Sequence, residues 1–251
     1  MLVNFLGNNN GLCITYEHTK LYNMTRITNS KGAFLFDLAL YISVMFLIRE
    51  VYFEQFDFIV NGLFWSLTTL VLATWRMKAR GYGWKDLGLI TPKNFWKTLG
   101  IMAVIMIAIV GSIMVFEIVK EQIPLNLNPD TSSEKAVAKF GLEKGGWTHF
   151  LLIIPFVWLQ SMLEEMLDRG FMINWIEKVF SSTTFATILA VLLQALIFGF
   201  RHSYDLSERS ITVGIIGLVM GTVYVLSGRN LWPLIIAHCI LNTLSFVEKV
   251  M

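Results

Sequence analysis

Residues 164–169 of this chain read Glu-Glu-Met-Leu-Asp-Arg and lie inside an otherwise apolar stretch. A charged side chain at membrane depth is costly, so a cluster of this kind is by default a candidate functional site. Two later apolar segments carry histidines in the pairs Phe198…His202 and His238…Asn242. Residues four apart lie on the same face of a helix. The three segments together predict one polar site inside a bundle of membrane helices.

The acidic run divides into parts with different expected roles. Glu165 and Arg169 are four residues apart with the acid on the N-terminal side, the favourable order for a helical ion pair. We predict that this pair is structural, because it neutralises the arginine and fixes the orientation of the helix. Glu164 is rotated by about 100° from Glu165 and is free to face a cavity. Burial disfavours the charged form of a carboxylate, which suits Glu164 to accept a proton from water.

Asp168 follows Glu164 by four residues, so a regular helix would place both on one face. Three interpretations of Asp168 stay open at this point. It is a metal ligand, a helper in proton transfer next to Glu164, or an acid that reaches toward the membrane interface.

The two membrane histidines also have alternative readings. A histidine at the end of a helix, such as His202, is often an interfacial residue, and the pair His238 and Asn242 could simply join helices by hydrogen bonds. The occurrence of both next to the acidic run favours a shared site. At 1.5 Å per residue, straight helices place His202 and His238 at different depths. A shared site therefore requires tilted or shortened helices.

Two chemistries fit these residues. Glu164, His202 and His238, with one position open for water, match the ligand set of a catalytic zinc site. Without metal, Glu164 and His202 would activate the water while His238 and Asn242 donate hydrogen bonds to the oxyanion. The His-Glu-x-x-His motif of helical zinc proteases is absent. The sequence leaves both possibilities open.

Composition predicts a polytopic membrane protein, since 55% of the 251 residues are hydrophobic and only 15% are charged. The net charge of +2 gives no support for a nucleic-acid partner. We expect an all-α transmembrane helical bundle, with a polar N-terminal segment at 1–32, a transmembrane domain at 33–251 and a catalytic core at about 148–247. The fourth span is expected to continue toward Phe180, because no turn cluster follows it. The seven predicted spans are 33–49, 56–75, 96–119, 148–167, 183–202, 210–227 and 231–247.

The connection at 76–97 is rich in lysine and arginine and contains a single acid, Asp86. The positive-inside rule then places this loop and the N-terminus in the cytoplasm and the C-terminus outside. Composition and the lack of a targeting signal favour a bacterial cell membrane. In the sixth span, Gly214, Gly217 and Gly221 are spaced to allow close helix packing.

The order Glu-Glu-x-x-x-Arg, Phe-x-x-x-His and His-x-x-x-Asn resembles the CPBP family of intramembrane metalloproteases. This family is also called the CAAX protease and bacteriocin-processing, or Abi, family. The loop at 83–89 is similar to the segment that precedes the core in many members, and the resemblance covers about 83–247. It implies a catalytic set and a supporting set that includes Phe198 of the second motif. The catalytic set is Glu164, His202, His238 and Asn242, and Glu165 and Arg169 support it.

Two residues depart from the family pattern. Members commonly carry an aromatic or apolar residue at the position of Asp168, and Arg201 is unusually polar for a residue that directly precedes the histidine. Neither departure removes a motif residue. Both leave the substrate choice and the optimum pH open.

The predicted function is an intramembrane endopeptidase that hydrolyses a peptide bond of a membrane-associated peptide or protein, in bacteriocin immunity or signal-peptide maturation. Removal of the C-terminal tail of prenylated CAAX proteins is an alternative substrate class. A non-catalytic membrane immunity or binding protein is an alternative of a different kind. A proton-coupled transporter also uses buried Glu and His, but no inverted repeat supports it.

Overall fold

The computed structural model describes residues 29–123, 127–128 and 139–251, so most of the predicted polar segment 1–32 lies outside the described residues. Within these ranges the chain forms helices and no strands, with one isolated bridge between Asn128 and Ser207. The helices are α2 Lys31–Leu47, η1 Ile48–Glu50, α3 Phe58–Ala79, α4 Phe95–Gln122, α6 Trp147–Glu165, η2 Met166–Ile173, α7 Asn174–Val179, α8 Thr184–Ser203, α9 Glu208–Leu226 and α10 Trp232–Val250.

Seven helical segments of the described chain are long and apolar enough to span a membrane. Their bounds agree with the seven predicted spans to within a few residues. The fourth is a continuous run from Trp147 to Val179, composed of α6, η2 and α7. The expected extension toward Phe180 is therefore confirmed. The all-α polytopic class is confirmed as well.

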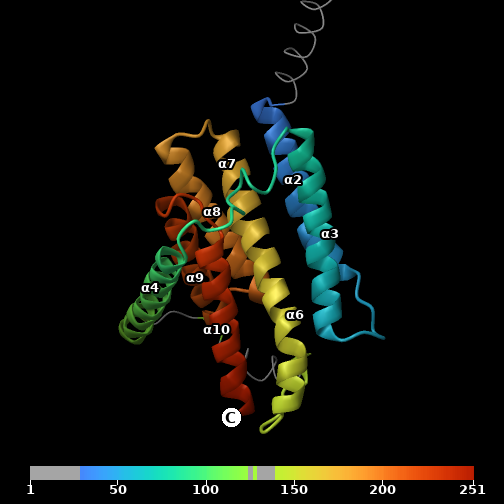
Figure 1. Cartoon of the computed structure of the whole chain (residues 1–251), viewed down its shortest axis with the longest axis vertical. Coiled ribbons are helices and arrows are strands. Elements are labelled where there is room, and N and C mark those ends of the chain that lie inside the picture. Colours follow the sequence, from blue (N-terminus) through green and yellow to red (C-terminus); the bar gives the residue numbers. More distant parts are fainter. Residues whose placement is uncertain (1–28, 124–126, 129–138) are drawn as a thin grey trace, which may run out of the picture.

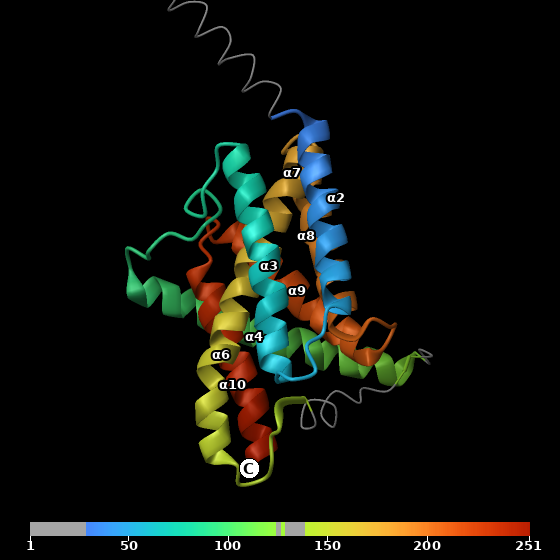
Figure 2. The same cartoon turned by 90° about the vertical axis from the view of Figure 1, so that its right-hand side faces the viewer.

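The continuous helix α6–η2–α7 is the central element of the bundle (Figure 1). In that view α2 and α3 flank it on one side, and α8, α9 and α10 lie on the other. Helix α4 contacts α9 and α10 and runs crosswise to the long helices (Figure 2). All eight residues of η2 are buried, and η2 has π-helical geometry, which is rare and occurs mostly at functional sites.

Helix α10 begins inside the molecule. The backbone nitrogen of Leu231 donates to the carbonyl oxygen of Gly88 at 2.9 Å, and the Tyr224 hydroxyl donates to the carbonyl oxygen of Leu87 at 2.9 Å. Leu231 is fully buried. The loop at 83–89 thus covers the turn between α9 and α10. This buried start lets the second turn of α10 meet the end of α8, although neither helix is shortened, since α8 has 20 residues and α10 has 19.

Helices α8 and α9 pack closely through glycines. A Cβ atom added to Gly199 would collide with the backbone oxygen of Ser210 on α9. Gly217 approaches Ala195, where an added Cβ would lie 3.3 Å from the Cα atom. The close packing predicted for the glycines of the sixth span is confirmed.

We expect Gly199→Ala to lower the stability of the bundle by about 1–3 kcal/mol, because backbone atoms have to move apart to admit the methyl group. Gly214→Ala is the matched control, since its nearest neighbour, the Ala195 carbonyl oxygen, would lie 3.6 Å from the new methyl carbon. Unfolding of both variants in detergent measures the difference. Equal stability of the two variants would contradict the packing argument.

Candidate active site

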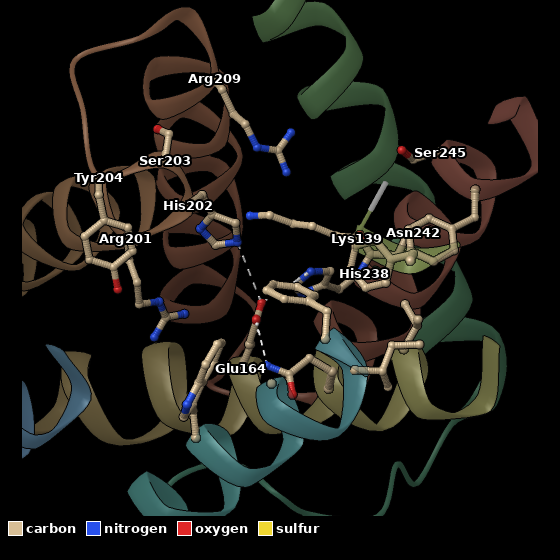
Figure 3. A pocket seen from close by; sticks show the side chains of 18 of the residues that line it. Lys139, Glu164, Arg201, His202, Ser203, Tyr204, Arg209, His238, Asn242 and Ser245 are labelled. Atoms are coloured by element: carbon tan, nitrogen blue, oxygen red, sulfur yellow. Dashed lines mark hydrogen bonds and ion pairs between the residues drawn. The ribbon is translucent and has the colours of Figure 1, made fainter. Parts of the chain in front are cut away.

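The structure brings Glu164 and both membrane histidines together from three helices. Glu164 lies in the last turn of α6, His202 in the last turn of α8 and His238 in the second turn of α10. The Glu164 Oε2 atom is 4.0 Å from His202 Nε2 and 3.8 Å from His238 Nε2. Figure 3 shows the carboxylate directed toward the His202 imidazole.

Each imidazole is oriented through its Nδ1 atom. His202 Nδ1 lies 2.6 Å from the carbonyl oxygen of Phe198, and His238 Nδ1 lies 2.7 Å from Glu165 Oε1. A carbonyl or carboxylate oxygen accepts hydrogen bonds, so both Nδ1 atoms carry the proton. In a neutral ring the Nε2 atom that faces Glu164 is then the lone-pair nitrogen, and a second proton on the ring makes it a donor.

Glu165 and Arg169 form the predicted ion pair, with Arg169 Nη1 at 3.1 Å from Glu165 Oε1. Both side chains are fully buried. The same carboxylate oxygen accepts the hydrogen bond from His238, and the Arg169 guanidinium stacks 4.2 Å from the ring centroid of Phe198. One carboxylate thus holds both the arginine and the catalytic-set histidine of α10.

The second oxygen of the Glu164 carboxylate has a partner that the sequence reasoning missed. Gln160 Nε2 donates to Glu164 Oε1 at 3.1 Å and lies 2.7 Å from the Ser66 hydroxyl of α3. Gln160 precedes Glu164 by four residues, and this spacing was the signal that could have found it. The amide fixes the carboxylate so that Oε2 faces the histidines.

Asn242 lies one turn after His238 on α10 and lines the same cavity. Its side-chain amide donates to the Ser161 hydroxyl at 2.9 Å, and that hydroxyl donates to the Val157 carbonyl oxygen. An amide nitrogen carries two protons, so one remains for another acceptor.

Asp168 does not share the cavity with Glu164, contrary to the expectation from a regular helix. Its side chain is fully buried, and Arg201 Nη2 donates to its Oδ2 atom at 2.8 Å. The reading as an interfacial acid is wrong, because no part of the side chain is exposed. Asp168 lies in π-helical η2, where successive residues turn by less than in an α-helix.

A cavity of about 760 Å³ opens next to Glu164, a size suited to a peptide segment or drug-sized ligand. Polar residues of the site and apolar residues of α3 and α6 share its wall. Figure 3 shows the labelled polar side chains gathered around Glu164. The apolar members of the wall include Phe58, Ile59, Trp65 and Phe156.

The predicted zinc ligands have the right donor types but not the spacing of a closed site. Two ligands at zinc bond lengths of about 2.0–2.2 Å lie about 3.3–3.6 Å apart across a tetrahedral ion. The distances from Glu164 Oε2 to the two Nε2 atoms are 4.0 and 3.8 Å. In the described part of the chain, no three His, Cys, Asp or Glu side chains converge to hold a metal ion. We therefore derive no chemical step through a metal.

The fold and site define a polytopic membrane protein with a glutamate and two histidines around one intramembrane cavity. Residues 146–244 match the family model described as "Type II CAAX prenyl endopeptidase Rce1-like". This segment, which contains all three motifs, is similar to the Rce1-like group of the CPBP family. The resemblance inferred from the motifs is confirmed, and the family indicates a CAAX-type membrane protease. Comparisons with curated proteins and with solved structures gave no match.

We expect Glu165→Ala to destabilise the protein by about 3–5 kcal/mol, because Arg169 would remain buried without its carboxylate. The double variant Glu165→Leu/Arg169→Leu is the matched comparison, since it removes both charges. Denaturant unfolding in mild detergent should show the single variant to be less stable than the double variant. A single variant as stable as the parent would show that the pair does not hold the helix.

Proposed function

We propose that the chain is an intramembrane endopeptidase in which Glu164 activates the attacking water. The observation that supports this most directly is the separation of Glu164 Oε2 from the two Nε2 atoms, 4.0 and 3.8 Å. These distances exceed a direct hydrogen bond, yet a water oxygen at about 2.8 Å from each atom fits between them. Groups that only join helices would instead contact one another directly.

The proposed reaction follows from the orientation of these groups. Glu164 takes a proton from the water, and His202 Nε2 accepts its second hydrogen bond. The resulting hydroxide adds to the carbonyl carbon of the scissile bond. The former carbonyl oxygen, now negative, accepts hydrogen bonds from Asn242 and from the protonated form of His238. Glu165 can balance the charge of that imidazolium. The carbon–nitrogen bond then breaks as Glu164 returns the proton to the leaving amine.

This arrangement argues against the non-catalytic alternative. Glu165 and Asp168 each have a direct cationic partner, Arg169 and Arg201. Among the described residues, Glu164 Oε2 receives no direct hydrogen bond and faces the cavity instead. A carboxylate kept without a direct cationic partner in an apolar bundle is costly, which favours a role in chemistry.

Membrane-associated peptides are the proposed substrates, because the cavity joins a polar centre to the apolar side chains of α3 and α6. Bacteriocin immunity and signal-peptide maturation are the proposed settings. The type II CAAX prenyl endopeptidase family that residues 146–244 match favours a second candidate, the prenylated C-terminal tail. Cleavage of matched peptides with and without a farnesyl group separates the two, since a prenyl-tail protease would need the lipid.

We expect Glu164→Gln to lower cleavage of membrane peptides by at least about 100-fold, because the amide cannot accept the proton. His202→Gln should also reduce kcat. Glu177→Gln is the matched control, a buried glutamate on the same long helix that does not line the cavity. Purified variants in liposomes, with fragments identified by mass spectrometry, provide the measurement. Cleavage that is equal in the parent and in Glu164→Gln would contradict the proposed role of Glu164.

The zinc prediction has its own test. From the spacing of the side chains, we expect purified protein to hold less than one zinc per chain and to keep its activity after dialysis against a chelator. Elemental analysis of the parent and of His238→Ala measures the metal directly. Stoichiometric zinc in the parent that is lost in His238→Ala would show that Glu164, His202 and His238 close around the ion.

A further inference from the structure

Asp168 and Arg201 form a buried ion pair between η2 and α8. Arg201 Nη2 lies 2.8 Å from Asp168 Oδ2, the Asp168 side chain is fully buried and that of Arg201 is 11% exposed. Asp168 follows Glu164 by one turn, and Arg201 directly precedes His202. The pair thus links the helix that carries the proposed base, Glu164, to the helix that carries His202.

Stability alone does not account for this pair. Removing two charges from water costs about as much as their attraction returns, and apolar replacements of buried pairs are often equally stable. Asp168 Oδ1 is buried without a hydrogen-bond partner in the described residues, which adds a further cost. Because the Asp168–Arg201 pair contributes little net stability, its presence next to Glu164 and His202 calls for a functional explanation.

The two histidines differ in how they are anchored. His238 is bonded directly to Glu165 of the long helix, whereas His202 bonds only to the carbonyl oxygen of Phe198 in its own helix. Besides the stacking of Arg169 on Phe198, a polar link from the end of α8 to the long helix runs through Arg201 to Asp168. The Arg201 side chain also lies 3.3 Å from the Met45 sulfur of α2, and its backbone carbonyl oxygen accepts a hydrogen bond from Arg49 of η1 at 3.3 Å.

Asp168 also decides where the arginine points. Arg201 and Glu164 both line the cavity, and a guanidinium without its own carboxylate would be drawn to the nearest one. A direct bond between Arg201 and Glu164 would occupy the oxygen that the water needs. Asp168 instead binds the guanidinium at 2.8 Å.

We propose that Asp168 and Arg201 are positioning residues that set His202 against Glu164 and keep Glu164 free of a cationic partner. This inference rests on the proposed function, because it assigns the pair to the same reaction. Neither residue touches the scissile bond. Their effect is carried by the position of α8 and by the direction of the arginine side chain.

The kinetic test uses the apolar double variant Asp168→Leu/Arg201→Met, which removes both charges together. We expect kcat to fall about tenfold or more while KM stays within about twofold and stability is retained. Arg201→Gln should lose activity in the same way, and Arg201→Lys should recover part of it because the charge is kept. Glu177→Gln/Arg229→Gln is the matched control, because this pair at 2.7 Å joins the long helix to the turn between α9 and α10. A double variant with the kcat of the parent overturns the proposal.

A second measurement does not depend on cleavage. The chain has four histidines, so nitrogen-labelled histidine signals can be assigned by single substitutions in detergent micelles. We expect the His202 imidazole signals to shift in the apolar double variant and those of His238 to stay in place. Unchanged His202 signals contradict the positioning role. Because this readout needs no substrate, a parent that cleaves nothing refutes the proposed reaction without deciding the positioning role.

Discussion

The compensation of charge inside an apolar bundle is the constraint on which this structure depends. A lone charge at this depth is costly, so each buried ionic group has to find a partner on another turn or another helix. The same constraint joins α2 to α3, where Asp37 is fully buried and accepts from Arg76 and Arg80, each at 2.7 Å. In the centre it joins the long helix to itself, to α8 and to α10. The polar contacts therefore specify which helices meet, while apolar packing fills the space between them.

This compensation also distinguishes the three acids at the centre of the long helix, Glu164, Glu165 and Asp168. Glu165 is saturated by Arg169 and His238, and Asp168 is held by Arg201. Glu164 alone has a neutral amide as its direct partner, and its other oxygen faces two imidazoles across the cavity. Glu165 and Asp168 therefore have structural roles, and Glu164 is the carboxylate that remains available for chemistry.

The sequence predicted the parts of this arrangement that depend on length and local spacing. Hydropathy located all seven helical segments, and the i,i+4 order identified the pair of Glu165 and Arg169. It could not predict the partner of Asp168, because Arg201 is distant in sequence and the pairing depends on how α8 meets η2. Hydropathy also measures length and not direction, so neither the crosswise course of α4 (Figure 2) nor the buried start of α10 was foreseen.

The partner of Asp168, and not the rotation of its helix, explains why the expectation of a shared cavity failed. Four residues come close to one full turn in an α-helix and in a π-helix alike, but Asp168 is bonded to Arg201 of α8. Within residues 164–168, Glu164 faces the cavity, Glu165 bonds to α10 and Asp168 bonds to α8. A π-helical segment is less favourable than a regular helix and persists where surrounding contacts require it. Here those contacts are the bond from Glu165 to His238 of α10 and the bond from Asp168 to Arg201 of α8, which flank the Glu164 carboxylate.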